Sequence, residues 1–455
     1  METLNQIVQW ILALGPSVLM PVIIFLLALA FRLPPGKALR AGLLVGVGFI
    51  GINLVVGLLS SSLGGASQAM VERTGRDLSV LDVGWPVAAT IAWADPSSAL
   101  LIPLVLGANA LLLVLRLTRT MNIDIWNIWH FAFAGMLAAS VTDSILIGLA
   151  TGVVISVFYL LIADLVAPRF ESYFGLPGVT CTTASVATWA PITYCLDWIW
   201  ERIPGLNKIN LNPEAMQRRV GVLADPLVIG IVIGALTGVL AGYDASEVMT
   251  LGMSMGAVML LLPRMVAVLM EGLVPISEGA RELMSKWFGK QKVYIGMDAA
   301  LALGNTANLA TAALVIPITV LLAFVLPGNR VLPFVDLASM AYFMVFAVLF
   351  NKGNILRGVL NGTILMTASL YLATWIAPVV SDVAHSVDYA FPSDVNEIVA
   401  LGTGSHWVEV LLVESMRLTP IALPILLVGT LAGMWWRRKR ASAETDDVAP
   451  ANAIG

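Results

Sequence analysis

Two segments of this chain match each other at one constant spacing of 210 residues, the separation of Ile145 from Ile355. Glycine and proline matches are the most informative, because two apolar helices share Val and Leu by chance. The spacing predicts that the chain folds as two structurally related halves. The matched pairs are Pro16/Pro226, Gly42/Gly252, Gly46/Gly256, Gly148/Gly358 and Gly152/Gly362.

The composition places both halves in a membrane. Hydrophobic residues make up 58% of the 455 residues and charged residues 12%, and the mean hydropathy is +0.89. In an ordinary soluble domain about a quarter of the residues are charged. The net charge of -4 comes without a basic patch, so no nucleic acid partner is expected. Cys181 and Cys195 form no CxxC pair, and we expect both to be buried apolar fillers.

Apolar stretches of roughly 17 to 25 residues number about eleven, which predicts an all-α polytopic protein that crosses the lipid bilayer many times. The first, residues 7–31, has no basic segment before it and is interpreted as a retained helix. Lys and Arg accumulate in cytoplasmic loops, so the N-terminus is expected outside and the basic cluster 437–440 inside. The stretches begin near Ile7, Leu39, Ala99, Ile128, Ile145, Val222, Val248, Ala310, Leu332, Ile355 and Ile421.

With five spans in each half, the halves would insert in opposite orientations, because five is an odd number. Inverted repeats of this kind recur in secondary transporters, which hold substrate near the midplane at broken helices. We expect a first five-span repeat over residues 1–170, a hairpin and cytoplasmic connection over 171–221, and a second, inverted repeat over 222–378. An outer acidic loop and a last span would occupy 379–436, followed by a basic stop and disordered cytoplasmic tail over 437–455.

Each half contains a polar interruption that a simple spanning helix would not tolerate. The segments 82–96 and 295–309 are predicted to be re-entrant, and they begin near Asp82 and Asp298. An ionisable group at membrane depth is costly unless it is paired or solvated, so it is a functional candidate by default. The alternative is that each Asp caps a half-helix by accepting hydrogen bonds from its free backbone N–H groups.

Polar residues that could bind a substrate concentrate at these breaks and in residues 119–130. A buried site that hydrogen-bonds to sugar hydroxyls discriminates well, because a wrong ligand leaves its polar groups unpaired. Alternatively, His130 is an interhelical hydrogen-bonding residue, and Trp126 and Trp129 mark the membrane interface. No catalytic or metal-ligating set is predicted. The candidate substrate-binding residues are Asp82, Trp85, Asp124, Asn127, His130, Thr182, Thr183, Asp298, Asn305 and Asn308.

At several of these positions the chain resembles the galactitol-type enzyme IIC of the bacterial phosphoenolpyruvate-dependent sugar phosphotransferase system, in the ascorbate-galactitol superfamily. The resemblance covers almost the whole chain. The motifs that carry it are LDVGWP at 81–86, NIDIWNIWH at 122–130, ERIPGLNK at 201–208, LAGYD at 240–244 and PGNRVLPF at 327–334.

The resemblance implies a homodimeric permease subunit of the bacterial inner membrane, with a fixed scaffold and a core that moves as an elevator. A cytoplasmic IIB partner, which IIA charges through a phosphocysteine, would phosphorylate the polyol or sugar. The chain would then be the membrane component of a phosphotransferase complex, with no cofactor and no phosphorylated residue of its own.

Two departures from the galactitol-type pattern concern the substrate. The middle hairpin reads VTCTT at 179–183 and the segment after Asp298 includes GNT at 304–306, where the family pattern places histidines. Another polyol or sugar is therefore an open alternative to galactitol. Cys181 is not expected to be the phosphorylated cysteine, because that residue belongs to a soluble IIB domain and a thiol in an apolar hairpin is poorly reactive.

Two other functions remain as alternatives. An ion-coupled secondary transporter could use Asp82, Asp298 and His130 as a proton or sodium site. A membrane-embedded transferase would need an acidic cluster with metal-binding spacing, such as DxxD, which the sequence lacks. A glycine-rich phosphate loop with Lys is also missing, so the chain is not expected to use ATP itself.

Overall fold

The computed structural model describes residues 16–74, 78–95, 97–124, 127–209, 211, 226–288, 293–333, 335–387, 389, 391, 397–402 and 406–446. Within these ranges the chain is mostly helical. Among the described residues, three helices are long and apolar enough to cross a membrane: α7 (Ile145–Phe174), α13 (Thr306–Val325) and α16 (Ile355–Ser386). They support the membrane class, whereas the count of about eleven spans stays a prediction.

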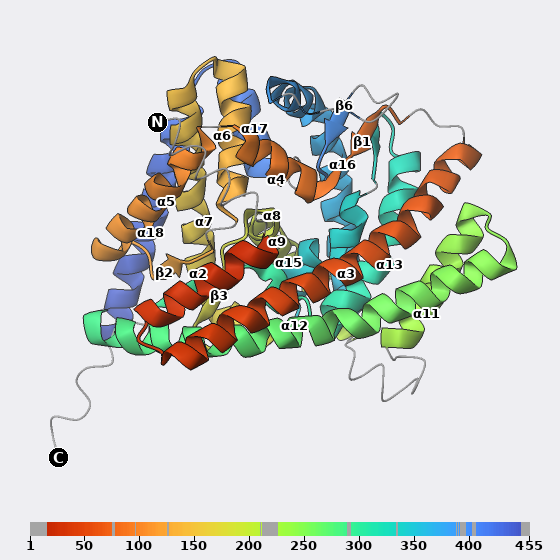
Figure 1. The fold of residues 1–455 in the computed structure, drawn as a ribbon. Coiled ribbons are helices and arrows are strands. Elements are labelled where there is room, and N and C mark those ends of the chain that lie inside the picture. Colours follow the sequence, from red (N-terminus) through yellow and green to blue (C-terminus); the bar gives the residue numbers. More distant parts are fainter. Residues whose placement is uncertain are drawn as a thin grey trace.

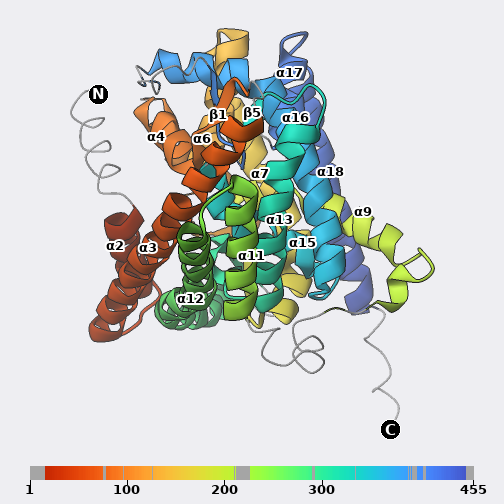
Figure 2. The same ribbon diagram turned by 90° about the vertical axis from the view of Figure 1, so that its right-hand side faces the viewer.

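Two very long helices lie side by side across one face of the molecule (Figure 1). They are α3 (Pro35–Thr74) and α12 (Ala245–Phe288), with 40 and 44 residues, or about 60 and 66 Å at the usual helical rise. Gly272 of α12 lies against the backbone of Ala41, and Gly51 of α3 lies against Met265, so the helices pack antiparallel. Figure 2 shows α2, α3 and α12 on one side of the molecule and α9 and α18 on the opposite side.

Three pairs of described helices lie 210 residues apart along the chain, and in two of these pairs the helix starts themselves fall within the described residues. The pairs are α2 (Pro16–Ala30) with α11 (Pro226–Ala241), α3 with α12, and α7 with α16. Both helices of the last pair begin with a side-chain N-cap. The Ser144 side chain accepts a hydrogen bond from Ile147 N, and the Asn354 side chain accepts one from Arg357 N. These side chains satisfy an N–H group that the first turn leaves free.

The predicted all-α fold needs correction, because the described residues include six short strands in two three-stranded sheets. One sheet has the order β5–β1–β6 and is called the upper sheet here; the other has the order β2–β4–β3 and is called the lower sheet. All pairings are parallel. The strands are β1 (Val80–Asp82), β2 (Thr120–Asn122), β3 (Val179–Cys181), β4 (Tyr294–Met297), β5 (Val331–Leu332) and β6 (Glu397–Val399).

Each sheet combines strands from both halves of the chain. β1 lies between β5 of the second predicted repeat and β6, which follows that repeat. β4 lies between β2 of the first predicted repeat and β3, in the connection after it. The strands occupy the polar breaks that the sequence predicts at Asp82 and Asp298. Extended backbone inside a membrane protein needs partners for its N–H and C=O groups, and pairing with the other half supplies them.

Three further boundaries differ from the expected ones. The span expected from Leu332 is replaced by short elements, because the chain first pairs in β5 and then turns around the buried Asp336. α16 continues to Ser386, beyond the boundary expected at 378. α18 (Ala422–Asp446) stays helical through the basic cluster 437–440 and into the segment after it, where a disordered tail was expected; residues 447–455 lie outside the described ranges, as do 1–15.

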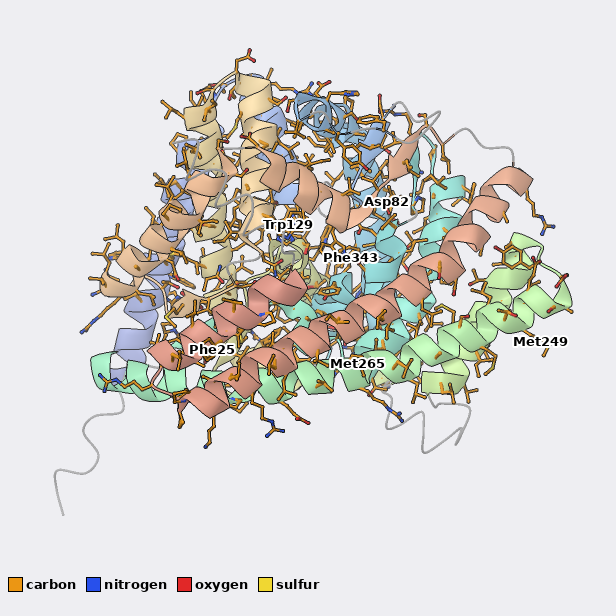
Figure 3. All side chains as sticks on the ribbon, viewed as in Figure 1. Phe25, Asp82, Trp129, Met249, Met265 and Phe343 are labelled. Carbon is orange, nitrogen blue, oxygen red and sulfur yellow. The ribbon has the colours of Figure 1, made fainter. Side chains whose placement is uncertain are left out.

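The remaining elements pack around α7 and α16. Large apolar side chains such as Phe131, Phe170 and Phe346 are fully buried there, and Figure 3 labels Trp129 and Phe343 near the middle of the molecule. The remaining elements are α4 (Gly84–Ala94), α5 (Ser98–Val114), α6 (Ile128–Thr142), α8 (Ala184–Ala187), α9 (Ala190–Trp200), η1 (Leu206–Lys208), η3 (Ala299–Ala302), η4 (Val335–Ser339), α14 (Met340–Phe343), α15 (Val345–Leu349) and α17 (Trp407–Met416).

Candidate functional site

The carboxyl ends of the lower-sheet strands bring two carboxylates together. Asp298 follows β4, where it caps η3, and Asp124 follows β2. Parallel strands end at the same edge of a sheet, so residues that follow them become neighbours. The Asn127 side-chain amide donates to Asp124 Oδ2 over 2.6 Å and to Asp298 Oδ2 over 2.8 Å. One amide group therefore bridges the two carboxylates.

Hydroxyl groups from the end of β3 complete this polar cluster. Thr182 Oγ1 donates to Asn122 Oδ1 over 3.0 Å, and that oxygen also accepts from Asp124 N. Thr183 Oγ1 accepts from Ala299 N over 2.9 Å. All three lower-sheet strands thus contribute polar groups to one place.

Aromatic residues of α6 and α4 lie beside the cluster. His130 Nδ1 lies 3.0 Å from Asn127 O, which only accepts, so Nδ1 carries the hydrogen and Nε2 accepts from Ser185 Oγ over 3.2 Å. The Trp129 ring stacks on the His130 ring with centroids 3.9 Å apart, and Trp85 stacks on Trp129 at 6.4 Å. Ring faces of this kind can pack against the C–H faces of a sugar.

The cluster is buried but not sealed. Asp124, Asn127 and His130 are buried, as are both threonines, whereas Asn122, Asp298 and Trp85 keep intermediate exposure. Tyr342 of α14 also keeps intermediate exposure and lies within electrostatic reach of Asp124 and Asp298. The sequence-based list missed Tyr342, which no motif or polar break of the sequence marks.

Asp82 lies elsewhere, at the end of β1 in the upper sheet (Figure 3). Its Oδ1 accepts from Gly84 N over 3.1 Å and from Leu401 N over 2.9 Å, and its Oδ2 accepts from Asp336 N over 2.9 Å. Gly84 has φ +76°, a left-handed conformation that favours glycine. These contacts tie β1 to the chain around Asp336 and Leu401 and do not join Asp82 to the lower-sheet cluster. The capping alternative fits Asp298, the N-cap of η3, whereas α4 begins after Val83 without a side-chain cap.

Asn305 and Asn308, the other two asparagines of the predicted set, make local structural contacts. Asn305 caps α13, where its Oδ1 accepts from Asn308 N over 3.1 Å and from Tyr173 OH over 3.2 Å. Asn308 is buried, and its Nδ2 donates to Ala341 O over 2.8 Å. No hydrogen bond between described residues joins either side chain to Asp124 or Asp298.

The two cysteines differ in their exposure to solvent. Cys181 is buried in β3, as expected, but Cys195 is exposed on α9, so its expected burial was wrong. α9 presents an outward apolar face with Tyr194 and Trp198 also exposed. Trp126 lies outside the described residues. Within the described ranges no group of three His, Cys, Asp or Glu side chains could hold a metal ion.

Comparison with known proteins identifies the family of this chain. The family described as the PTS system sugar-specific permease component matches residues 10–394, most of the chain. The chain belongs to this permease family. The permease is 39% identical over 370 residues to the PTS system galactitol-specific EIIC component of Escherichia coli K12, covering 81% of this chain and 82% of that protein. The corresponding component of Escherichia coli O157:H7 matches equally well.

A third relative is named only as a permease. It is the putative permease IIC component of Escherichia coli K12, 36% identical over 397 residues, which cover 87% of this chain and 91% of that protein. The permease is therefore a membrane protein of a sugar phosphotransferase system. Permeases of this kind act on a sugar substrate together with cytoplasmic IIA and IIB proteins. The ion-coupled transporter is not favoured by any of these matches.

Proposed function

We propose that this permease binds a galactitol-like polyol or sugar at the lower-sheet cluster and carries it across the inner membrane for phosphorylation by a IIB partner. The observation that carries the proposal is the carboxylate pair Asp124–Asp298 held by one Asn127 amide. The relatives whose names specify galactitol, at 39% identity, support the substrate class.

The chemistry of the cluster suits a neutral ligand with many hydroxyl groups. A carboxylate accepts up to about four hydrogen bonds. Asp298 receives one from Ala300 N and shares the Asn127 amide with Asp124, which leaves oxygen lone pairs for further donors. A polyol supplies such donors, whereas a phosphorylated sugar would bring negative charge beside the carboxylates. The site would therefore favour free substrate and disfavour the phosphorylated product.

In this proposal the permease contributes position and not covalent chemistry. It presents a substrate hydroxyl in a fixed orientation to the phosphocysteine of IIB, and such orientation lowers a reaction barrier by removing the entropic cost of alignment. Cys181 is unsuited to carry the phosphoryl group, because it is buried within β3.

We infer that the two halves are inverted repeats and that transport follows an elevator motion. The equal spacing of helix starts, the exchange of central strands between halves and the antiparallel packing of α3 on α12 support this. α2, α3, α11 and α12 would form the scaffold, and the elements around both sheets would form the moving core. The N-terminus would lie outside and the C-terminus in the cytoplasm.

We also infer a homodimer formed through the scaffold. A row of exposed apolar side chains follows α3 at helical spacing, and a contiguous apolar face on a membrane helix must contact lipid or protein. A second copy of the scaffold would cover this face while the core remains free to move. The residues of the row are Leu39, Leu43, Val47, Ile50 and Leu54.

Uptake by right-side-out membrane vesicles that enclose the soluble phosphotransferase proteins tests the function. With phosphoenolpyruvate and the soluble phosphotransferase proteins present, we expect radiolabelled galactitol to appear inside only as a phosphate. Omission of IIB should stop the formation of galactitol phosphate. Vesicles that contain the Asp298→Asn variant are the matched negative control. Accumulation of free galactitol driven by a proton or sodium gradient would instead establish the ion-coupled transporter.

A further inference from the structure

A buried ion pair connects the last helix to the strand that leads into the candidate site. Asp164 of α7 has a fully buried side chain, and its Oδ2 lies 2.8 Å from Arg437 Nη2 of α18, whose side chain is 10% exposed. The sequence interpretation placed Arg437 in a basic stop at the membrane surface. The structure places its guanidinium inside the protein instead.

Asp164 also holds the start of β2. Its Oδ1 accepts from Arg119 N over 2.9 Å and from Thr120 Oγ1 over 2.8 Å. Arg437 also contacts this turn directly, since its Nη2 donates a hydrogen bond to Leu117 O over 2.9 Å. The turn before β2 is thus fixed from one side by a carboxylate of α7 and from the other by a guanidinium of α18.

The position of β2 determines the position of the candidate site. Thr120 pairs with Tyr294 and Asn122 pairs with Gly296 in the lower sheet. The chain then continues within a few residues to Asp124 and Asn127, which contact Asp298. A shift of the turn at 117–120 along the strand would therefore move the groups that are proposed to hold the substrate.

The second half has a neutral counterpart of this arrangement. Thr374 follows Asp164 by the 210-residue spacing and lies on α16, where its Oγ1 accepts from Arg330 N over 3.1 Å just before β5. The hydroxyl holds the backbone without a buried charge. The first half therefore has a carboxylate, Asp164, where the second half has the hydroxyl of Thr374. The positive charge that pairs with this carboxylate comes from α18, a helix outside both predicted repeats.

We propose that Arg437 is a positioning residue: through Asp164 and Leu117 O, α18 holds β2 in the register that the substrate-binding cluster requires. α18 consequently belongs to the same rigid unit as the lower sheet and moves with it. The substrate part of this inference rests on the proposed function, whereas the statement about β2 does not.

The experiment uses the purified full-length permease, and compares Arg437→Met with Arg438→Met. The neighbouring Arg438 is exposed and donates to Leu115 O over 3.0 Å, so its variant loses the same charge from the same helix. Two quantities are measured: hydrogen exchange of the backbone at 117–124 and 329–332, and the dissociation constant for radiolabelled galactitol.

For Arg437→Met we expect faster exchange at 117–124 with no change at 329–332, and binding weaker by roughly tenfold or more, since small misplacements at a site are costly. Arg438→Met should match the wild type, and Arg437→Lys should recover part of the loss. Wild-type exchange at 117–124 together with wild-type affinity in a folded Arg437→Met protein would overturn the proposal.

If Arg437→Met does not fold, the double variant Asp164→Asn/Arg437→Met decides, because it leaves no unpaired buried charge. It should fold with fast exchange at 117–124, and wild-type exchange there would overturn the proposal. Should the wild-type protein fail to bind galactitol, the proposed substrate is wrong, and the exchange measurement alone still tests the role of Arg437.

Discussion

The upper and lower sheets each place a pair of carboxylates at their strand ends, and the two pairs are held in different ways. In the upper sheet, Asp82 and Asp336 accept from five backbone N–H groups, those of Gly84, Trp85, Asp336, Leu401 and Gly402. In the lower sheet, Asp124 and Asp298 share the side-chain amide of Asn127, and each also accepts from one backbone N–H group, that of Asn127 or of Ala300.

The difference indicates a division of roles between related positions. Backbone donors are fixed by the fold and leave little freedom, so the upper pair suits a structural junction that joins β1 to the turns after β5 and β6. A side-chain amide can rotate and exchange partners, so the lower pair suits a ligand that arrives and leaves. Equal residue types at equivalent breaks therefore do not imply equal function.

The largest expected effect comes from breaking the upper pair. Asp82→Ala would leave three buried backbone donors without their acceptor, and each costs about 1–3 kcal/mol. We expect this variant to fail to accumulate as folded protein, as judged by size-exclusion chromatography of a fluorescent fusion and by thermal melting. Asp298→Ala is the matched control and should fold. A stable Asp82→Ala protein that has lost only galactitol binding would reverse the assignment of roles.

Asp298→Asn should give the next largest effect, this time on binding. The substitution keeps the shape and one acceptor but removes the charge, and hydrogen bonds to charged groups contribute about 1.5–3 kcal/mol. We expect galactitol binding to weaken by at least tenfold in equilibrium dialysis, with the melting temperature nearly unchanged. Normal affinity in the folded variant would remove Asp298 from the site. His130→Ala is expected to behave similarly, because its ring borders the same cluster.

Gly148→Ala and Gly358→Ala compare matched glycines in the two halves. A Cβ at 148 would lie 2.7 Å from the backbone oxygen of Gly135, whereas a Cβ at 358 would lie 2.7 Å from Thr311 Oγ1, a side-chain atom. Overpacking costs about 1–3 kcal/mol, and the side chain can rotate away while the backbone cannot. Thermal melting should therefore show the larger loss for Gly148→Ala. The reverse order would mean that α16 packs more rigidly than α7.

The smallest expected effect is that of Tyr173→Phe. This variant removes one hydrogen bond to Asn305, worth about 1 kcal/mol, and should lower the melting temperature slightly without changing galactitol affinity. The result would support Asn305 as a helix cap. A tenfold loss of affinity would instead return Asn305 to the substrate-binding set.

Much of this arrangement could be predicted from local sequence. The apolar composition predicts the membrane class, and the spacing predicts where α7 and α16 begin, because Ser144 and Asn354 are good N-caps followed by apolar runs. Polar residues at Asp82 and Asp298 correctly predict breaks. The strands could not be predicted, since segments of two to four residues have no periodicity of their own. Tyr342 was missed because no motif or polar break marks it, and only the tertiary structure places it near Asp124 and Asp298.

The sequence alone determined that the chain lies in a membrane, that its helices start at matched positions in two halves, and that carboxylates interrupt those halves. These properties depend on local composition and caps. Only the tertiary structure decided which carboxylates meet, because β1 pairs with strands that lie some 250 and 317 residues further along the chain (Val80 with Val331 and Glu397). It also decided that Arg437 is buried against Asp164, since burial depends on packing between distant helices and not on the basic cluster around that residue.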